Sequence, residues 1–186
     1  TPLTLAETAS VFGEMLTFKS LLKNEKNLKE KKALLANKVE DMLNTVVRQI
    51  AFYQFEKKVH LQRKKSELST EEICSIWLQV QKESLGPSIE FEEEYKYYWS
   101  YIPHFIHSPF YVYAYAFGDC LVNSLYGVYE EGLSNFDKKY ITLLESGGSK
   151  DYKNLLKPFH LNPSNSDFWK KGIKVIENFI DDLEKI

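Results

Sequence analysis

The chain has 186 residues, of which 44% are hydrophobic and 27% charged, as in an ordinary globular domain. Its net charge of -2 gives no reason to expect nucleic acid or an anionic membrane surface as a partner. Cys74 and Cys120 are isolated thiols without the spacing of a disulfide scaffold or a cysteine zinc site, so a reducing cytoplasm is the expected compartment.

The first predicted helix has an unusual charge pattern. A capping box, Thr4-Leu5-Ala6-Glu7, opens it, and it runs to about Leu22. Between Thr4 and Phe18 the charged residues are Glu7 and Glu14, two turns apart on one face. Their neighbours are partly apolar, so each carboxylate needs a cation, a metal or hydrogen-bond donors. Glu7 is also explained as part of its own cap, and Glu14 as a structural acid with a partner. The opposite side should pack: Leu5, Ala9, Phe12 and Leu16.

The rest of the chain follows the helical period, with no alternating strand pattern. A long helix is predicted over about 26–65, with a buried stripe formed by Leu34, Leu35, Val39, Leu43, Val46, Val47 and Ile50. Further helices are predicted at 69–85, 91–101, 108–129, 134–145, 149–157 and from Ser166 onward, where Phe168, Ile173, Ile176, Phe179, Ile180 and Leu183 face inward. The predicted fold is all-α, and residues 1–186 are predicted to form a single helical unit.

Residues 97–118 carry no charged side chain, yet this segment is not simply apolar. It contains six of the twelve tyrosines and two of the four histidines, together with Pro103 and Pro109. A membrane span needs a continuous apolar run of about 20 residues, which this segment does not offer. Buried phenols and imidazoles need hydrogen-bond partners, so a core built for packing would use aliphatic residues instead. The segment is therefore predicted to contain groups that contact a substrate.

Two segments, Leu5–Glu14 and Ile102–Tyr115, closely resemble motifs of oligoendopeptidase F, a zinc metallopeptidase family related to thimet oligopeptidase. Glu83–Pro87 and Leu155–Phe159 are also similar to that family. The resemblance extends over nearly the whole chain, in the same order. It implies the all-α fold of a thimet oligopeptidase-like catalytic domain, hydrolysis of short peptides, and one zinc ion. In the family two histidines of a His-Glu-x-x-His helix and a later glutamate hold that ion, and Glu7 matches the glutamate.

The resemblance also implies roles for the uncharged segment. His104 matches a histidine that binds the substrate, and Tyr115 matches a tyrosine that stabilises the oxyanion of the tetrahedral intermediate. Tyr111 lies one turn before Tyr115 and is the natural second phenol. His107 and Tyr113 are weaker candidates for substrate binding: His107 also suits a cap or packing role, and Tyr113 points to the opposite face, which favours the core. Glu14 is a weak candidate to support the metal ligand.

The sequence departs from the family in one respect, because these 186 residues contain no His-Glu-x-x-His. A catalytic zinc ion needs three protein ligands and an open position. The chain is therefore expected to be the C-terminal part of a metallopeptidase catalytic domain, inactive and without zinc on its own. The N-terminal part of the same polypeptide would supply the histidines and the general base. The alternative is a non-catalytic helical domain that binds a peptide in an aromatic groove.

Overall fold

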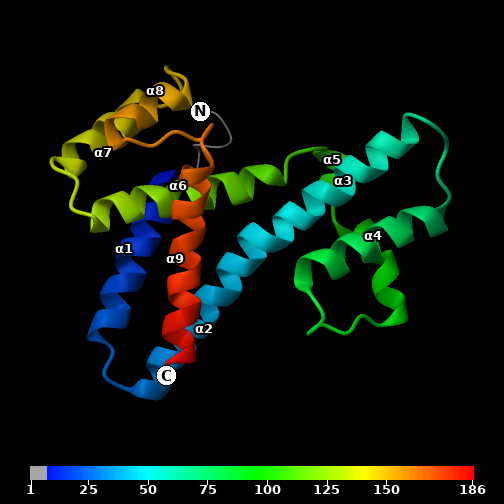
Figure 1. Cartoon of the computed structure of the whole chain (residues 1–186), viewed down its shortest axis with the longest axis horizontal. Coiled ribbons are helices and arrows are strands. Elements are labelled where there is room, and N and C mark those ends of the chain that lie inside the picture. Colours follow the sequence, from blue (N-terminus) through cyan, green and yellow to red (C-terminus); the bar gives the residue numbers. More distant parts are fainter. Residues whose placement is uncertain (1–7) are drawn as a thin grey trace. The chain divides into compact units, whose positions relative to one another are not determined.

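The computed structural model describes residues 8–186, which form helices and contain no strand, so the predicted all-α fold is confirmed. The described residues divide into two compact units (Figure 1). Unit 1 contains residues 8–42 and Phe117–Ile186, and unit 2 contains Leu43–Ala116. The prediction of a single helical unit stays a prediction. No helix in the described part is long and apolar enough to cross a membrane.

Unit 1 is built on the packing of long helices. It contains α1 (Thr8–Asn24), α2 (Leu28–Met42), α6 (Tyr113–Glu130) from residue 117 on, α7 (Phe136–Ser146), α8 (Tyr152–Leu156), the 3₁₀ helix η4 (Lys157–Phe159) and α9 (Ser166–Glu184). Helix α9 packs along α2, and α1 also contacts α2 (Figure 1). Aromatic rings fill this core: Phe12 stacks on Phe136, and Phe18 meets Phe179 edge to face. Such pairs add stability beyond the burial of their area.

Helix α9 approaches α6 very closely at Gly172. A Cβ atom at this position would lie 2.8 Å from the carbonyl oxygen of Cys120 and 3.2 Å from Oγ of Ser124. A real Cβ atom does not fit at that distance, so glycine is required here by the contact between the two backbones. Ser124 adds a hydrogen bond from its hydroxyl to the Phe168 carbonyl, at 2.9 Å. The start of α9 is therefore fixed to α6 by both packing and a polar contact.

Unit 2 is built around a buried tryptophan. It contains the π-helical turn η2 (Leu43–Arg48), α3 (Gln49–Arg63), α4 (Thr70–Leu85), the 3₁₀ helix η3 (Glu93–Tyr101), α5 (His104–His107) and the start of α6. Trp77 is fully buried and donates from Nε1 to the Tyr95 carbonyl at 3.0 Å. Its buried neighbours come from α3, α4 and the segment before α6: Ala51, Phe52, Phe55, Ile76, Val80 and Val112.

The long helix predicted over 26–65 is interrupted. Its first and last thirds are α2 and α3, but Leu43–Arg48 between them form the π-helical turn. A turn with one additional residue rotates the following face by about 100°. After the turn the predicted stripe fails at Ile50, which is exposed, and the buried face of α3 is formed by Ala51, Phe52, Phe55 and Glu56. Leu43, the first residue of the turn, is also exposed.

The buried faces of two other helices differ from the prediction. In α1 the predicted burial of Phe12 is confirmed, but Ala9 and Leu16 are exposed. The other buried residues of this helix are Thr8, Met15 and Phe18. In α9 the residue that faces α6 is Gly172. Because each residue of a helix is rotated by about 100° from the one before it, Ile173 points away from this contact and is exposed. The predicted burial of Phe168, Ile176 and Phe179 is confirmed.

The helix ends give a mixed result. The capping box at Ser69 is confirmed, with both reciprocal hydrogen bonds to Glu72 present. The last helix begins at Ser166 as predicted and is capped by the Asn165 side chain. Helix α7 begins at Phe136, two residues after the predicted start, and follows Asn135, which has a left-handed conformation and no side-chain cap. The helices predicted at 91–101 and 149–157 are a 3₁₀ helix, η3, and the short helix α8 followed by η4. The predicted capping box Thr4–Glu7 lies outside the described residues.

Candidate active site

Three of the predicted site residues form one group in unit 2. Nε2 of His104 lies 3.2 Å from the phenol oxygen of Tyr115, within hydrogen-bond distance. The His104 and Tyr111 rings stack with centroids 5.6 Å apart and planes 17° apart. The Tyr111 and Tyr115 rings meet edge to face at 5.3 Å. The structure therefore brings together an imidazole and two phenols, and this trio is called the ring group below.

The backbone around the ring group is not the helix that was predicted. A helix starting at Ser108 and Pro109 was expected, but α6 begins at Tyr113, and the short helix α5 ends at His107. Phe110 lies between them with a φ of 59°, a left-handed conformation that stops a helix from forming across it. Tyr111 therefore lies before α6, although its ring still reaches Tyr115. Val112 is fully buried in the core of unit 2 and anchors this segment.

The residues of the ring group are partly exposed. Tyr115 is 37% exposed, and His104 and Tyr111 are partly exposed. A phenol hydroxyl and an imidazole N–H are both donors to a carbonyl or to an oxyanion. An aromatic wall with two or three donors at its rim suits the backbone of a bound peptide.

The weaker candidates lie close to the ring group in sequence. His107 is exposed at the end of α5. The expectation that Tyr113 belongs to the core is wrong: it is 44% exposed, with its ring edge to face against Tyr53 at 6.2 Å. The small residues Ala114 and Ala116 are buried next to it and take the inward positions. A cavity of about 430 Å³ also lies in unit 2, between α3, α4, η3 and α5, and none of the predicted site residues lines it.

The predicted metal ligand, Glu7, lies outside the described residues. Within residues 8–186 no group of three or more His, Cys, Asp or Glu side chains could hold a metal ion. The described residues therefore do not form a zinc site by themselves.

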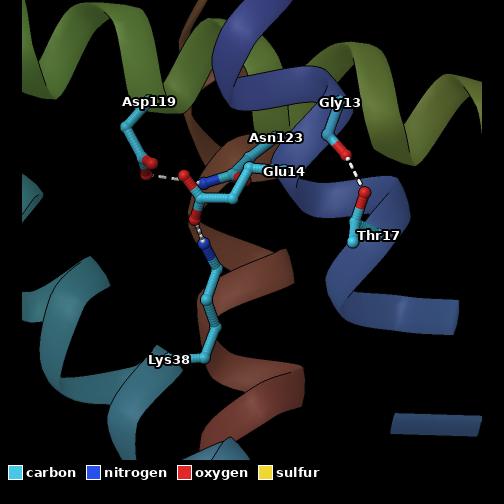
Figure 2. Close-up of polar contacts among 6 residues, drawn as sticks. All are labelled: Gly13, Glu14, Thr17, Lys38, Asp119 and Asn123. Carbon is cyan, nitrogen blue, oxygen red and sulfur yellow. Dashed lines mark hydrogen bonds and ion pairs between the residues drawn. The ribbon is translucent and has the colours of Figure 1, made fainter. Parts of the chain in front are cut away.

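Glu14, the second acid of the first helix, forms an ion pair with a lysine. Its carboxylate accepts a hydrogen bond from Nζ of Lys38, as Figure 2 shows. The Lys38 side chain is almost fully buried and also lies over the Phe18 ring, whereas the Glu14 side chain is 58% exposed. The interpretation of Glu14 as a structural acid with a partner therefore has direct support, and a role in supporting the metal ligand stays a prediction.

A second acid, Asp119, lies near Lys38 and Glu14. Asp119 on α6 is 8% exposed and accepts a hydrogen bond from Nδ2 of Asn123 at 2.7 Å (Figure 2). Burial raises the pKa of Asp119 to about 6, although the positive charge of Lys38 and the Asn123 hydrogen bond both act to lower it. The negative charge of Glu14 raises it further. Lys38, Glu14, Asp119 and Asn123 are called the charged cluster below.

Sequence reasoning missed the charged residues with the most unusual surroundings. Glu56 is buried on α3, and Lys38 and Asp119 are buried on α2 and α6. A signal existed for Glu56, because it lies four residues after Phe52 and three before Val59, on the apolar face of its helix. For Lys38 the pattern gave no signal, since Glu14 lies 24 residues away. Asp119 has a hydrogen-bond donor four residues on, in Asn123, but its nearby cation, Lys38, is distant in sequence.

Comparison with known proteins agrees with the resemblance noted in the sequence. The chain is 36% identical over 146 residues, 78% of its length, to an oligoendopeptidase F homologue of Borreliella burgdorferi, and this covers 25% of that protein. It is 30% identical over all 186 residues to the plasmid oligoendopeptidase F of Lactococcus lactis subsp. cremoris, covering 31% of that protein. The chain thus spans about a quarter to a third of the length of these curated relatives.

Solved structures share the fold. A crystal structure of a Chlamydophila abortus protein is 31% identical and superposes on 100% of the chain, using 31% of its own length, with a TM-score of 0.90. The oligoendopeptidase-F of Enterococcus faecium, at 24% identity, has the same fold, with a TM-score of 0.89 over 99% of the chain and 35% of its own length. Residues 1–175 match Peptidase family M3, and the chain therefore belongs to that family.

Proposed function

We propose that this chain is the substrate-binding part of a zinc metalloendopeptidase that hydrolyses short peptides. The observation that carries the proposal is the ring group, in which Nε2 of His104 lies 3.2 Å from the Tyr115 hydroxyl and against the Tyr111 ring. Membership of Peptidase family M3 and similarity to proteins named oligoendopeptidase F support it.

In this proposal Tyr115 donates a hydrogen bond to the oxyanion that forms when water adds to the scissile carbonyl. His104 then donates from Nε2 to the oxygen of Tyr115 and orients the phenol for this role. Tyr111 stacks on His104, fixes the plane of the imidazole and offers a second phenol to the peptide backbone. A donor aimed at developing negative charge contributes about 3 kcal/mol to the transition state. His107 and Tyr113 are secondary candidates for contact with the peptide.

The metal part of the proposal concerns Glu7. We place it as one zinc ligand, with the two histidines and the general base supplied by an N-terminal part of the same polypeptide. A bound zinc ion acts as a Lewis acid and lowers the pKa of its water. Because these 186 residues contain no His-Glu-x-x-His, we expect the chain alone neither to retain zinc nor to cleave peptides. A cytoplasmic location stays a prediction.

The test uses the proposed full-length polypeptide with a short fluorogenic peptide. Tyr115→Phe should lower kcat by about 10²-fold with little change in KM, because the lost hydrogen bond matters mainly in the transition state. The matched control is Tyr101→Phe, the same change at a highly exposed position of unit 2, and it should leave both constants unchanged. Unchanged turnover in Tyr115→Phe would remove the oxyanion role.

The zinc arm measures bound metal in the same polypeptide. Glu7→Ala should lose zinc, whereas Glu40→Ala, at an exposed position on α2, should keep it. Equal zinc content in the two variants would exclude Glu7 as a ligand. A full-length polypeptide with no His-Glu-x-x-His and no bound zinc would instead favour the non-catalytic, peptide-binding alternative.

A further inference from the structure

A carboxylate lies buried beneath the segment that carries the ring group. Glu56 on α3 is 2% exposed, and its neighbours on the inner face of α3 are Phe52 and Phe55. Its Oε1 accepts a hydrogen bond from the backbone N–H of Phe110 at 2.6 Å, and residues 8–186 offer no hydrogen-bond partner to Oε2. Burying a carboxylate is costly, so a position used only for packing would carry an aliphatic residue.

The residue held by Glu56 is in an unfavourable conformation. Phe110 has a φ of 59°, which a bulky side chain rarely adopts because its Cβ crowds the backbone. Helix α3 contacts it twice: Glu56 binds its N–H, and the His60 ring packs against the Phe110 ring with centroids 4.8 Å apart. Strained backbone persists where the surroundings fix it at more than one point.

The direction of the chain at Phe110 decides where Tyr111 lies. Phe110 follows α5, which carries His104, and directly precedes Tyr111 and the start of α6 with Tyr115. If this residue were right-handed, the helix predicted from Ser108 would run through it, and the backbone between His104 and Tyr115 would take another course. The left-handed turn at Phe110 is therefore a condition for the observed ring group.

From these contacts we infer that Glu56 is a positioning residue: its carboxylate holds Phe110 in the left-handed turn and so places His104, Tyr111 and Tyr115 together. The role in catalysis rests on the proposed function, but the role in positioning does not. Burial raises the pKa of Glu56, while the Phe110 N–H, His60 on its own helix and His104 on α5 lower it. Two cations at the end of α3, Arg63 and Lys64, line the same cavity as Glu56.

The first arm of the test is structural and uses the 186-residue chain. In ¹⁵N NMR spectra the Phe110 amide proton should shift downfield, and its shift should titrate with the Glu56 carboxyl in the wild type. Glu56→Leu fills the same space without an acceptor, so it should move the Phe110 amide upfield and weaken the nuclear Overhauser contacts between His104 and Tyr115. Glu56→Gln keeps an acceptor oxygen and should retain those contacts while the titration disappears.

The second arm measures activity in the proposed full-length polypeptide. Glu56→Leu should lower kcat/KM by tenfold or more with unchanged zinc content, and Glu56→Gln should recover most of the loss. Adding Phe110→Gly to Glu56→Leu should also restore activity in part, because glycine adopts a positive φ without the steric cost. A residue that acted only on global stability would not be rescued by a change that removes the Phe110 ring.

The two arms separate the possible failures. If Glu56→Leu folds and leaves the Phe110 amide and the His104–Tyr115 contacts unchanged, Glu56 does not position the ring group. If Glu56→Leu does not fold, the NMR comparison is made between the wild type and Glu56→Gln. In that case a Phe110 amide shift that does not titrate in the wild type overturns the inference. If the contacts change as expected while Tyr115→Phe keeps full turnover, the positioning role holds and the proposed function fails.

Discussion

Among the described residues each unit buries one acid, and the two acids have different hydrogen-bond partners. Asp119 in unit 1 lies among side chains, with Lys38 as a nearby cation and Asn123 as a donor from its own helix. Glu56 in unit 2 binds a backbone N–H, and the charges near it belong to two histidines. Asp119 is part of the contact of three helices, whereas Glu56 holds the backbone of a turn. We infer that Asp119 takes part in the packing of the helices of unit 1, whereas Glu56 fixes the backbone conformation at Phe110.

The largest expected effect tests the dependence of Asp119 on its cation. Lys38→Met removes the positive charge beside the buried Asp119 carboxyl and the partner of Glu14, so at pH 7 unit 1 should lose more unfolding free energy than the loss of an exposed ion pair costs. At pH 4 the loss should be much smaller, because Asp119 is then protonated. Urea unfolding followed by the indole N–H signal of Trp169 in NMR spectra measures unit 1, while the signal of Trp77 reports unit 2.

The matched control for this variant is Lys58→Met in unit 2. Lys58 pairs with Glu83 at 3.3 Å, and both side chains are at least a third exposed, so its removal should cost under about 1 kcal/mol. Similar losses for the two lysines would mean that the charged cluster behaves as an ordinary surface ion pair.

The second effect is the pH dependence produced by Asp119. Its pKa is raised to about 6 in the folded state, so the native state binds this proton more tightly than the unfolded state does. The associated stability is fully present below the ordinary aspartate pKa and is lost as the pH rises through 6. A shift of about two pKa units corresponds to about 3 kcal/mol. Asp119→Asn should remove this fall from the stability profile of unit 1, and a profile parallel to that of the wild type would show that the carboxyl is not shielded from water.

The smallest effect belongs to Glu56. Burial raises the pKa of this carboxyl, while the Phe110 N–H and the two histidines act against it, so the sign is the same as for Asp119. Unit 2 should lose stability as the pH rises through the folded pKa of Glu56, and Glu56→Gln should flatten that part of the profile, read from the Trp77 signal. A larger pH effect in unit 2 than in unit 1 would reverse the comparison between the two acids.

Local patterns predicted much of this molecule. The capping box at Ser69 and the inward position of Phe168 follow from neighbouring residues, so they were found from the sequence. His104, Tyr111 and Tyr115 were also found, because eleven residues separate the ends of the group and the resemblance points to them. The roles assigned to these three residues, and to Glu7, are proposals and were not tested by the fold.

Features that depend on distant contacts were not predicted. The start of α6 was placed too early because Glu56, 54 residues before Phe110, holds the turn that delays it. Lys38 and Glu14 are 24 residues apart and meet because α1 packs on α2. The π-helical turn at Leu43–Arg48 contains no proline or glycine, so no residue pattern indicated it. Beyond the turn Ile50, which was predicted to be buried, is exposed.

The close contact at Gly172 has a kinetic consequence. The backbone of Cys120 lies directly against α9 there, its thiol is buried, and burial raises the pKa of that thiol to about 12. Such a thiol reacts with an alkylating reagent only after α9 has separated from α6. Cys74, the other free and buried thiol, lies in the core of unit 2 against Trp99. The rates at which these two cysteines are alkylated therefore report how often each unit opens, without any substitution in the chain.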